Sequence, residues 1–148
     1  MEQVLLALIL AGGAAVVAAV LRRRRRTAPP TQPTFLAPAQ LDRADFARPE
    51  APFLVVVFTS STCHSCAAMA DKARVLASDQ VAVDVMEVTE HREVHRRYGI
   101  DAVPMVVVAD GAGVVGASFV GPASATDLWA AVAELRHPGS SPEPGLGR

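Results

Sequence analysis

Residues 52–85 combine apolar runs of strand length with apolar residues at helical spacing. Residues 52–58, PFLVVVF, are a continuous apolar run, typical of a strand buried on both faces. Residues 66–77 then place apolar side chains three or four positions apart, with charges on the other side, which predicts an amphipathic helix. Val81, Val83 and Val85 alternate with their neighbours and predict a second strand.

The pattern of residues 90–120 predicts a short helix followed by a β-hairpin. Residues 90–98, EHREVHRRY, suit a short helix that Gly99 ends. Residues 104–109, PMVVVA, and 114–120, VVGASFV, predict two strands joined by the turn sequence DGAG.

A last helix is predicted from Ser124, which forms an S-x-x-D capping pattern with Asp127. Leu128, Val132 and Leu135 form its inner face. The predicted order is therefore strand, helix, strand, helix, strand, strand, helix. Right-handed crossovers make the first two strands parallel, and the hairpin adds an antiparallel pair. We expect an α/β fold: a mixed central sheet with helices on both faces.

The segments around this domain, predicted over residues 41–136, have a different composition. Residues 27–40 contain four prolines and predict a stiff linker, in which 35–37, FLA, are a candidate edge strand. Residues 41–47 suit one or two helical turns. The tail, 137–148, lacks apolar periodicity and is predicted to be disordered.

The N-terminal part, residues 1–26, predicts a membrane anchor. Residues 4–21 carry no charge and, as a helix, span roughly 27 Å, close to the hydrocarbon layer of a bilayer. A cleaved signal peptide is the alternative, but residues 1–3 lack the basic character it requires. Residues 22–26 are five arginines, which favour the cytoplasmic side. We expect a single-pass protein with a cytoplasmic domain; an extracytoplasmic domain is the alternative.

Charge and cysteine content exclude two classes of protein. The net charge is −1, but without Glu2 and the five arginines 9 basic residues face 14 acidic ones, a difference of −5. This mildly acidic body offers no basic face for nucleic acid. Two cysteines do not make a disulfide-dense scaffold, so the core must be held by packing.

Those two cysteines, Cys63 and Cys66, lie where the first predicted strand passes into the first predicted helix. Cys63 is expected at the helix N-terminus, where unpaired N–H groups and the helix dipole favour a thiolate. Such placement lowers the pKa of a cysteine. Cys63 is then the attacking sulfur, and Cys66, deeper in the helix, resolves the mixed disulfide. Two buried, inert cysteines are the alternative, against which the polar residues 60–62 argue.

Metal binding is a weaker interpretation of the same residues. Structural zinc takes four ligands, whereas Cys63, His64 and Cys66 are three neighbours in one turn. His91 and His95 are spaced i, i+4, but HREVH is not the H-E-x-x-H motif. We expect both histidines on a solvated helix face and predict no metal site.

Taken together, these motifs resemble the thioredoxin family over roughly residues 34–136. The resemblance rests on C-x-x-C at a helix start, on RRYGIDAVPMVVV about forty residues later, and on a strand ending in FVG. It implies a thioredoxin fold and thiol–disulfide exchange without a cofactor beyond the dithiol. It also implies that Cys63 is the nucleophile, Cys66 the resolving cysteine and Pro104 a cis-proline beside the pair.

The resemblance further implies a substrate-binding surface and shows where this chain departs from the family. Val103 is expected to offer backbone groups to an extended substrate, and Gly121 to allow close approach. Thr62 replaces the family's tryptophan, so this contact is more polar. Val57 and Val85 replace a buried Asp and Lys that help move the resolving cysteine's proton. This favours a dedicated oxidoreductase or a sensor over a fast general reductase.

The two residues between the cysteines, His64 and Ser65, are predicted to tune their redox properties. A cationic His64 stabilises the Cys63 thiolate and therefore raises the reduction potential. The alternative is that His64 is an exposed loop residue with little effect.

The sequence therefore predicts a membrane-anchored thiol–disulfide oxidoreductase. Its expected partners are protein or peptide disulfides and dithiols, together with the lipid bilayer through residues 4–21. In a reducing cytoplasm the pair rests as the dithiol and acts as a reductant. The alternatives are a non-enzymatic module that binds peptides at Val103, and a copper or zinc carrier that uses Cys63, Cys66 and His64.

Overall fold

The computed structural model describes residues 35–140, which contain a four-stranded sheet in the order β2-β1-β3-β4. The first strand, β1, pairs in parallel with β2 and antiparallel with β3, and β3 pairs antiparallel with β4. This confirms the predicted mixed sheet. The strands are β1 (Phe53–Thr59), β2 (Val81–Glu87), β3 (Met105–Asp110) and β4 (Val115–Val120).

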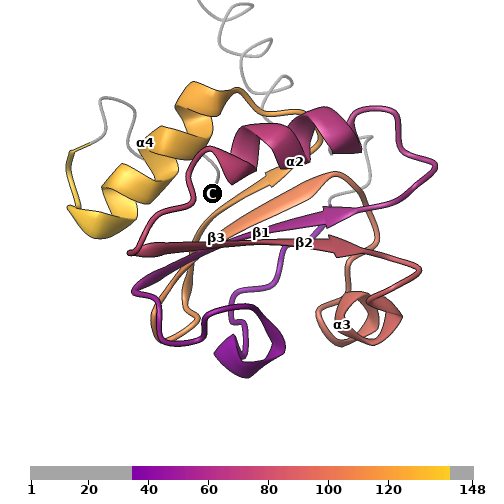
Figure 1. Cartoon of the computed structure of the whole chain (residues 1–148), viewed down its shortest axis with the longest axis horizontal. Helices are drawn as coiled ribbons and strands as arrows, with labels where there is room; N and C mark the ends of the chain where they lie inside the picture. The colour runs from indigo at the N-terminus through magenta and orange to yellow at the C-terminus, as the bar shows by residue number, and fades with distance from the viewer. Residues whose placement is uncertain (1–34, 141–148) are drawn as a thin grey trace, which may run out of the picture. The chain divides into compact units, whose positions relative to one another are not determined.

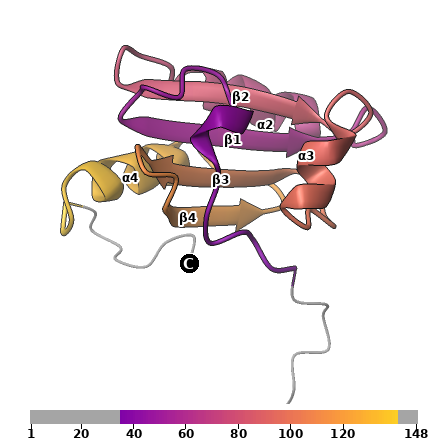
Figure 2. The same ribbon diagram turned by 90° about the horizontal axis from the view of Figure 1, so that it is seen from below.

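Helices cover both faces of the sheet, as predicted. Figure 1 shows α2 (Cys66–Arg74) and α4 (Ala125–Arg136) on one face. The short α3 (Arg92–Arg97) and the 3-10 helix η1 (Arg43–Asp45) lie on the other, which faces the viewer in Figure 2.

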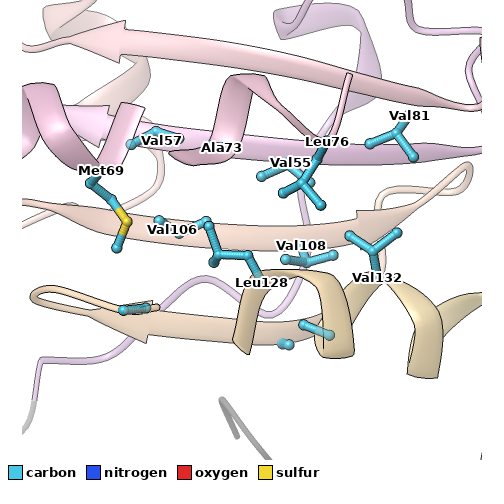
Figure 3. Packing of buried hydrophobic residues seen from close by; sticks show 13 residues of the cluster. Val55, Val57, Met69, Ala73, Leu76, Val81, Val106, Val108, Leu128 and Val132 are labelled. Carbon is cyan, nitrogen blue, oxygen red and sulfur yellow. The ribbon is translucent and has the colours of Figure 1, made fainter. Parts of the chain in front are cut away.

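The core consists of two apolar clusters because β1 is buried on both faces, with residues 54–58 at 0% exposure. Alternation along the strand sends Val55 and Val57 to the α2/α4 face. There they pack with Met69 of α2 and Leu128 of α4 (Figure 3). Leu54, Val56 and Phe58 belong to the cluster on the η1/α3 face.

The capping prediction at the start of α4 is confirmed. The Ser124 side chain accepts a hydrogen bond from the Asp127 N–H, and the Asp127 carboxylate accepts one from the Ser124 N–H. Leu128 and Val132 are buried, and Leu135 is partly buried against the same cluster.

Several boundaries differ from the prediction. The helix predicted over residues 66–77 ends at Arg74, although Leu76 beyond it is still buried. Residues 35–37 form no strand; instead Gln40 makes an isolated bridge with Val114. The helical turns expected within residues 41–47 are present as η1.

His95 corrects a prediction, because it is not on a solvated helix face. It is 5% exposed, its Nε2 lies 2.8 Å from the Met86 carbonyl oxygen, and its ring meets Phe58 edge to face. Only tertiary packing reveals this, since α3 has six residues and His95 is its one buried residue, with Val94 partly buried against the same cluster. His91 is half-buried.

The predicted anchor at residues 4–21, most of the linker and the end of the tail lie outside the described residues. Within residues 35–140, no helix has both the length and the apolar character needed to cross a membrane.

Candidate active site

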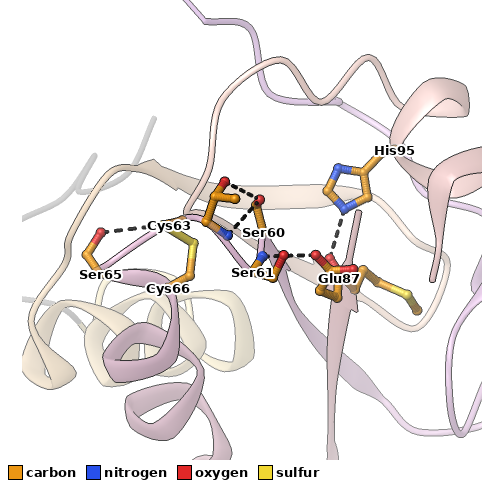
Figure 4. The surroundings of a disulfide bond; sticks show 9 residues. Ser60, Ser61, Cys63, Ser65, Cys66, Glu87 and His95 are labelled. Atoms are coloured by element: carbon orange, nitrogen blue, oxygen red, sulfur yellow. Dashed lines mark hydrogen bonds between the residues drawn. A yellow bond between two sulfur atoms is a disulfide. The ribbon is translucent and has the colours of Figure 1, made fainter. Parts of the chain in front are cut away.

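The segment between β1 and α2 is a tight turn that carries both cysteines. The Cys63 N–H donates to the Ser60 carbonyl at 3.1 Å, and the Cys66 N–H donates to the Cys63 carbonyl at 3.4 Å. Cys63 and Cys66 form a disulfide, with Cα atoms 5.4 Å apart (Figure 4). The pair is thus held at the start of α2, where the sequence placed it.

The two cysteines differ in exposure. Cys66, the first residue of α2, is 2% exposed, whereas Cys63 in the preceding turn is only half-buried. An incoming thiol or disulfide therefore reaches Cys63 more readily than Cys66.

The residues predicted to tune the pair lie in the same turn. Ser65 is the N-cap residue of α2 but makes no capping hydrogen bond; its Oγ lies 3.7 Å from the Cys63 Sγ. His64 is exposed. Thr62 is also exposed, and its hydroxyl oxygen lies 3.0 Å from the Ser60 Oγ. A polar, accessible loop thus surrounds the disulfide.

The second predicted constellation lies at the same end of the sheet. The Val103–Pro104 peptide bond is cis, and Pro104 is buried next to the start of β3. The Gly121 N–H donates to the Pro104 carbonyl at 2.8 Å. Gly121 has φ +87° and nothing within 4 Å of where a Cβ would stand, so its outer side is open.

Strand register brings these two constellations to one edge. Met105, which begins β3, pairs with Phe58 near the end of β1 and with Val120 at the end of β4. The cysteine turn follows β1, Pro104 precedes β3, and Gly121 follows β4. The structure therefore gathers at one end of the sheet residues that are up to 59 positions apart (Thr62 to Gly121).

Valines occupy the two sheet positions that the resemblance linked to the resolving cysteine, and one of them, Val85, lines the cysteine cavity together with Thr59. Val57 of β1 lies opposite Val85 of β2 in the parallel register, and Val57 is fully buried. Neither position supplies a charge to this part of the core.

Sequence analysis missed Glu87, the last residue of β2. Its carboxylate accepts hydrogen bonds from the Thr89 hydroxyl and from the N–H groups of Ser61, Thr89 and Glu90. These bonds, that from the Thr89 side chain foremost, lower the pKa of Glu87 to about 2. The only signal in the sequence is an acidic residue closing a valine-rich strand, and strand ends often carry one by chance.

Glu87 and both cysteines also line one cavity of about 310 Å³ between α2 and the end of β2. In residues 35–140, no group of three or more His, Cys, Asp or Glu side chains is placed to hold a metal ion.

Residues 40–136 match the model of a protein family whose description is "Thioredoxin-like domain". The chain belongs to this thioredoxin-like family. The resemblance inferred from C-x-x-C and Y-G-I-x-x-V-P is confirmed, as is the fold that it implied. A comparison with curated proteins found no match.

Solved thioredoxins are among the similar structures. The germline-specific thioredoxin Deadhead of Drosophila melanogaster is 26% identical with a TM-score of 0.51, over 59% of this chain and 84% of that one. The reduced thioredoxin pre-protein of Schistosoma mansoni is also 26% identical, with a TM-score of 0.48, over 57% and 79%. The thioredoxin-like domain and its bonded cysteine pair are consistent with thiol–disulfide redox function.

Proposed function

We propose that this protein exchanges disulfides with protein or peptide substrates through Cys63. The observation that carries the proposal is the unequal pair at the start of α2: a half-exposed Cys63 bonded to a buried Cys66. Exchange requires one sulfur that a partner can reach and a second that only the first can reach.

In the reducing direction, the Cys63 thiolate attacks one sulfur of a substrate disulfide. The substrate S–S bond breaks, and its other sulfur leaves as a thiolate. The Cys66 thiolate then attacks the Cys63 sulfur and releases the second substrate thiolate. The substrate gains two electrons and two protons, and the pair becomes a disulfide that an external dithiol must reduce.

The substrate-binding surface in this proposal is the end of the sheet around the turn. Val103 offers backbone groups to an extended peptide, Pro104 forms part of the surface beside it, and Thr62 supplies a polar contact. The open side of Gly121 leaves room for a substrate backbone. No bound cofactor takes part in the exchange.

The apolar contact of Val57 with Val85 supports slow proton removal from Cys66, because no carboxylate at either position accepts that proton. We therefore propose one or a few dedicated partners rather than general reduction.

His64 is proposed to stabilise the Cys63 thiolate when protonated. His64→Gly is then expected to lower the reduction potential of the pair, measured by equilibration with glutathione. An unchanged potential contradicts this role.

Residues 4–21 and the arginines 22–26 support a membrane anchor with the domain in the cytoplasm, where the pair acts as a reductant. A reporter fused after Arg148 that is active in only one compartment tests this topology. Reporter activity outside the cytoplasm contradicts this topology. Oxidation, isomerisation or electron delivery to an exported protein then becomes the better interpretation.

A trapping experiment tests the exchange reaction. Cys66→Ser leaves Cys63 free to form a mixed disulfide that cannot be resolved, so covalent adducts are expected to accumulate. Cys63→Ser is the matched control and is expected to trap nothing. If both variants give equal amounts of adduct, or neither gives any, the protein is not an exchange enzyme, and a peptide-binding module becomes the better interpretation.

A further inference from the structure

Glu87 joins the cysteine turn to the end of β2. Its Oε1 accepts the Ser61 N–H at 2.9 Å from the turn after β1. Its Oε2 accepts the Thr89 N–H at 2.6 Å and the Glu90 N–H at 3.3 Å from the turn after β2. Figure 4 shows this carboxylate beside Ser61, on the side of the turn away from the disulfide. One side chain therefore bridges two turns 26 residues apart.

The bridged turn leads directly to the reactive sulfur. Ser60 precedes the anchored Ser61, and its carbonyl accepts the Cys63 N–H. The Ser60 Oγ also accepts the Thr62 N–H at 3.3 Å. A turn held at Ser61 by Glu87 is thus continuous, through local hydrogen bonds, with the backbone of Cys63.

Glu87 also brings a negative charge to the cavity that both cysteines line. Its low pKa keeps it ionised at neutral pH, and in the described part of the chain it takes part in no ion pair. The other charged groups that line its cavity, Asp71 and Arg74 of α2, are paired with each other at 2.6 Å. The charge of Glu87 is therefore not neutralised by a neighbour.

We propose that Glu87 is a positioning residue whose fixed carboxylate disfavours the Cys63 thiolate and so favours the disulfide form of the pair. The reason is electrostatic: a like charge nearby raises the free energy of a thiolate but not that of a neutral disulfide. Glu87 differs from a buried acid that accepts the resolving cysteine's proton, because four hydrogen bonds make it a poor base. It opposes the proposed effect of His64. The inference rests on the proposed exchange function.

Glu87→Gln in the full chain tests the proposal, because the amide keeps the size and one acceptor oxygen but removes the charge. Equilibration with glutathione is expected to shift about 3- to 10-fold toward the dithiol, which corresponds to a pKa change of about half to one unit. The pH midpoint of Cys63 alkylation is expected to fall by the same amount. Glu90→Gln, an exposed neighbour with the same change in net charge, is the matched control and is expected to leave both unchanged.

Glu87→Asp separates charge from structure. It keeps the charge and is expected to stay within about 2-fold of the wild-type redox equilibrium, even if the shorter side chain loosens the turn. The proposal is overturned if Glu87→Gln leaves the equilibrium unchanged, or if Glu87→Asp shifts it as far as Glu87→Gln does. Because glutathione reports on the pair without a protein substrate, this result is independent of whether Cys66→Ser traps a partner.

Discussion

The two faces of the sheet bury different chemistry. On the α2/α4 face the buried cluster that contains Val57 is entirely apolar. On the η1/α3 face Arg43 and His95 are buried, at 8% and 5% exposure. The only buried polar side chain that lines the cavity of the cysteine pair is Thr59, a neutral hydroxyl at 6% exposure, whereas the buried guanidinium and imidazole in residues 35–140 belong to the other face.

The polar groups on the η1/α3 face bind backbone carbonyls. Arg43 donates to the carbonyls of Ala51 at 2.9 Å, Arg48 at 3.0 Å and Asp110 at 3.2 Å. His95 contacts the carbonyl of Met86. Each group adds a hydrogen-bond partner to carbonyls at loops or strand ends; those of Arg48 and Asp110 also accept the backbone N–H groups of Ala51 and Gly113.

Helix length explains the difference. The helices α2 and α4 have 9 and 12 residues, enough to cover a sheet face with apolar side chains. By contrast, η1 has 3 residues and α3 has 6. Such short elements bury little apolar surface and depend more on specific hydrogen bonds. The first face is thus held by packing, and the second by packing together with side-chain to backbone contacts.

The largest expected effect comes from placing a charge on the apolar face. Val57→Asp leaves a buried carboxylate without a partner and is expected to lower the free energy of unfolding by about 3–5 kcal/mol. Adding Val85→Lys, its neighbour in register, is expected to recover part of this loss. Urea denaturation measures both, with Val57→Ala as the cavity control. A stable Val57→Asp single variant is incompatible with the contrast between the faces.

On the opposite face, His95→Leu is expected to cost about 1–3 kcal/mol, because the Met86 carbonyl loses a hydrogen bond. His91→Leu, at a half-buried position of the same turn, is the control and should change stability by less than about 0.5 kcal/mol. Thermal unfolding of both variants measures the difference. Equal losses indicate that His95 contributes only apolar volume.

Tyr98→Phe is expected to cost about 1 kcal/mol by breaking one of the side-chain links between α3 and η1, while the Arg97–Asp45 ion pair remains. The Tyr98 hydroxyl donates to Asp45 at 2.5 Å, and this bond is the main reason that the pKa of Asp45 is lowered, followed by the bond from Arg97. A lowered folded-state pKa stabilises the protein above the unfolded value of about 3.9, and this stabilisation is lost as pH falls through the folded value.

Denaturation between pH 6 and pH 2 checks that link. Tyr98→Phe should show a smaller loss of stability on acidification than the wild type, and Asp45→Asn should remove the same component. If the double variant loses the sum of the two single effects, the residues act independently and the proposed link is wrong.

The smallest effect is expected at the start of α4, away from the contrast itself. Ser124→Ala removes one half of the capping box at an exposed position and should cost about 0.5–1 kcal/mol, the low end of the range for such caps. Thr126→Ala, an exposed position in the same first turn, is the control. Because alanine has a higher helix propensity than threonine, a loss at Thr126 as large as that at Ser124 means that side-chain truncation in this turn, and not the lost capping bond, lowers the stability.

Sequence patterns predicted the α2/α4 face better than the other. Continuous or periodic apolar runs identified all four strands, α2 and α4, and the capping box marked the first turn of α4. The η1/α3 face was harder to predict, because a short element with a single buried residue shows no repeating spacing of buried positions. His95 was therefore placed in solvent, although it is buried.

Some residues of the candidate site were likewise predictable from the sequence, and one was not. Local spacing placed Cys63, Cys66 and Ser65 in one turn, and the resemblance to thioredoxins added Pro104 and Gly121. Glu87 was not found, because nothing in its local sequence shows which turn its carboxylate contacts.

By itself, the sequence determined the order of the elements, the apolar faces of the strands and the placement of the pair before a helix. These depend on periods of two and 3.6 residues and on a spacing of three, all of which are local. Tertiary structure alone decided how completely Cys66 is buried, that the ends of β1 and β4 meet the start of β3, and that Glu87 reaches Ser61. Those contacts join residues far apart in the chain, and only strand register and packing bring them together.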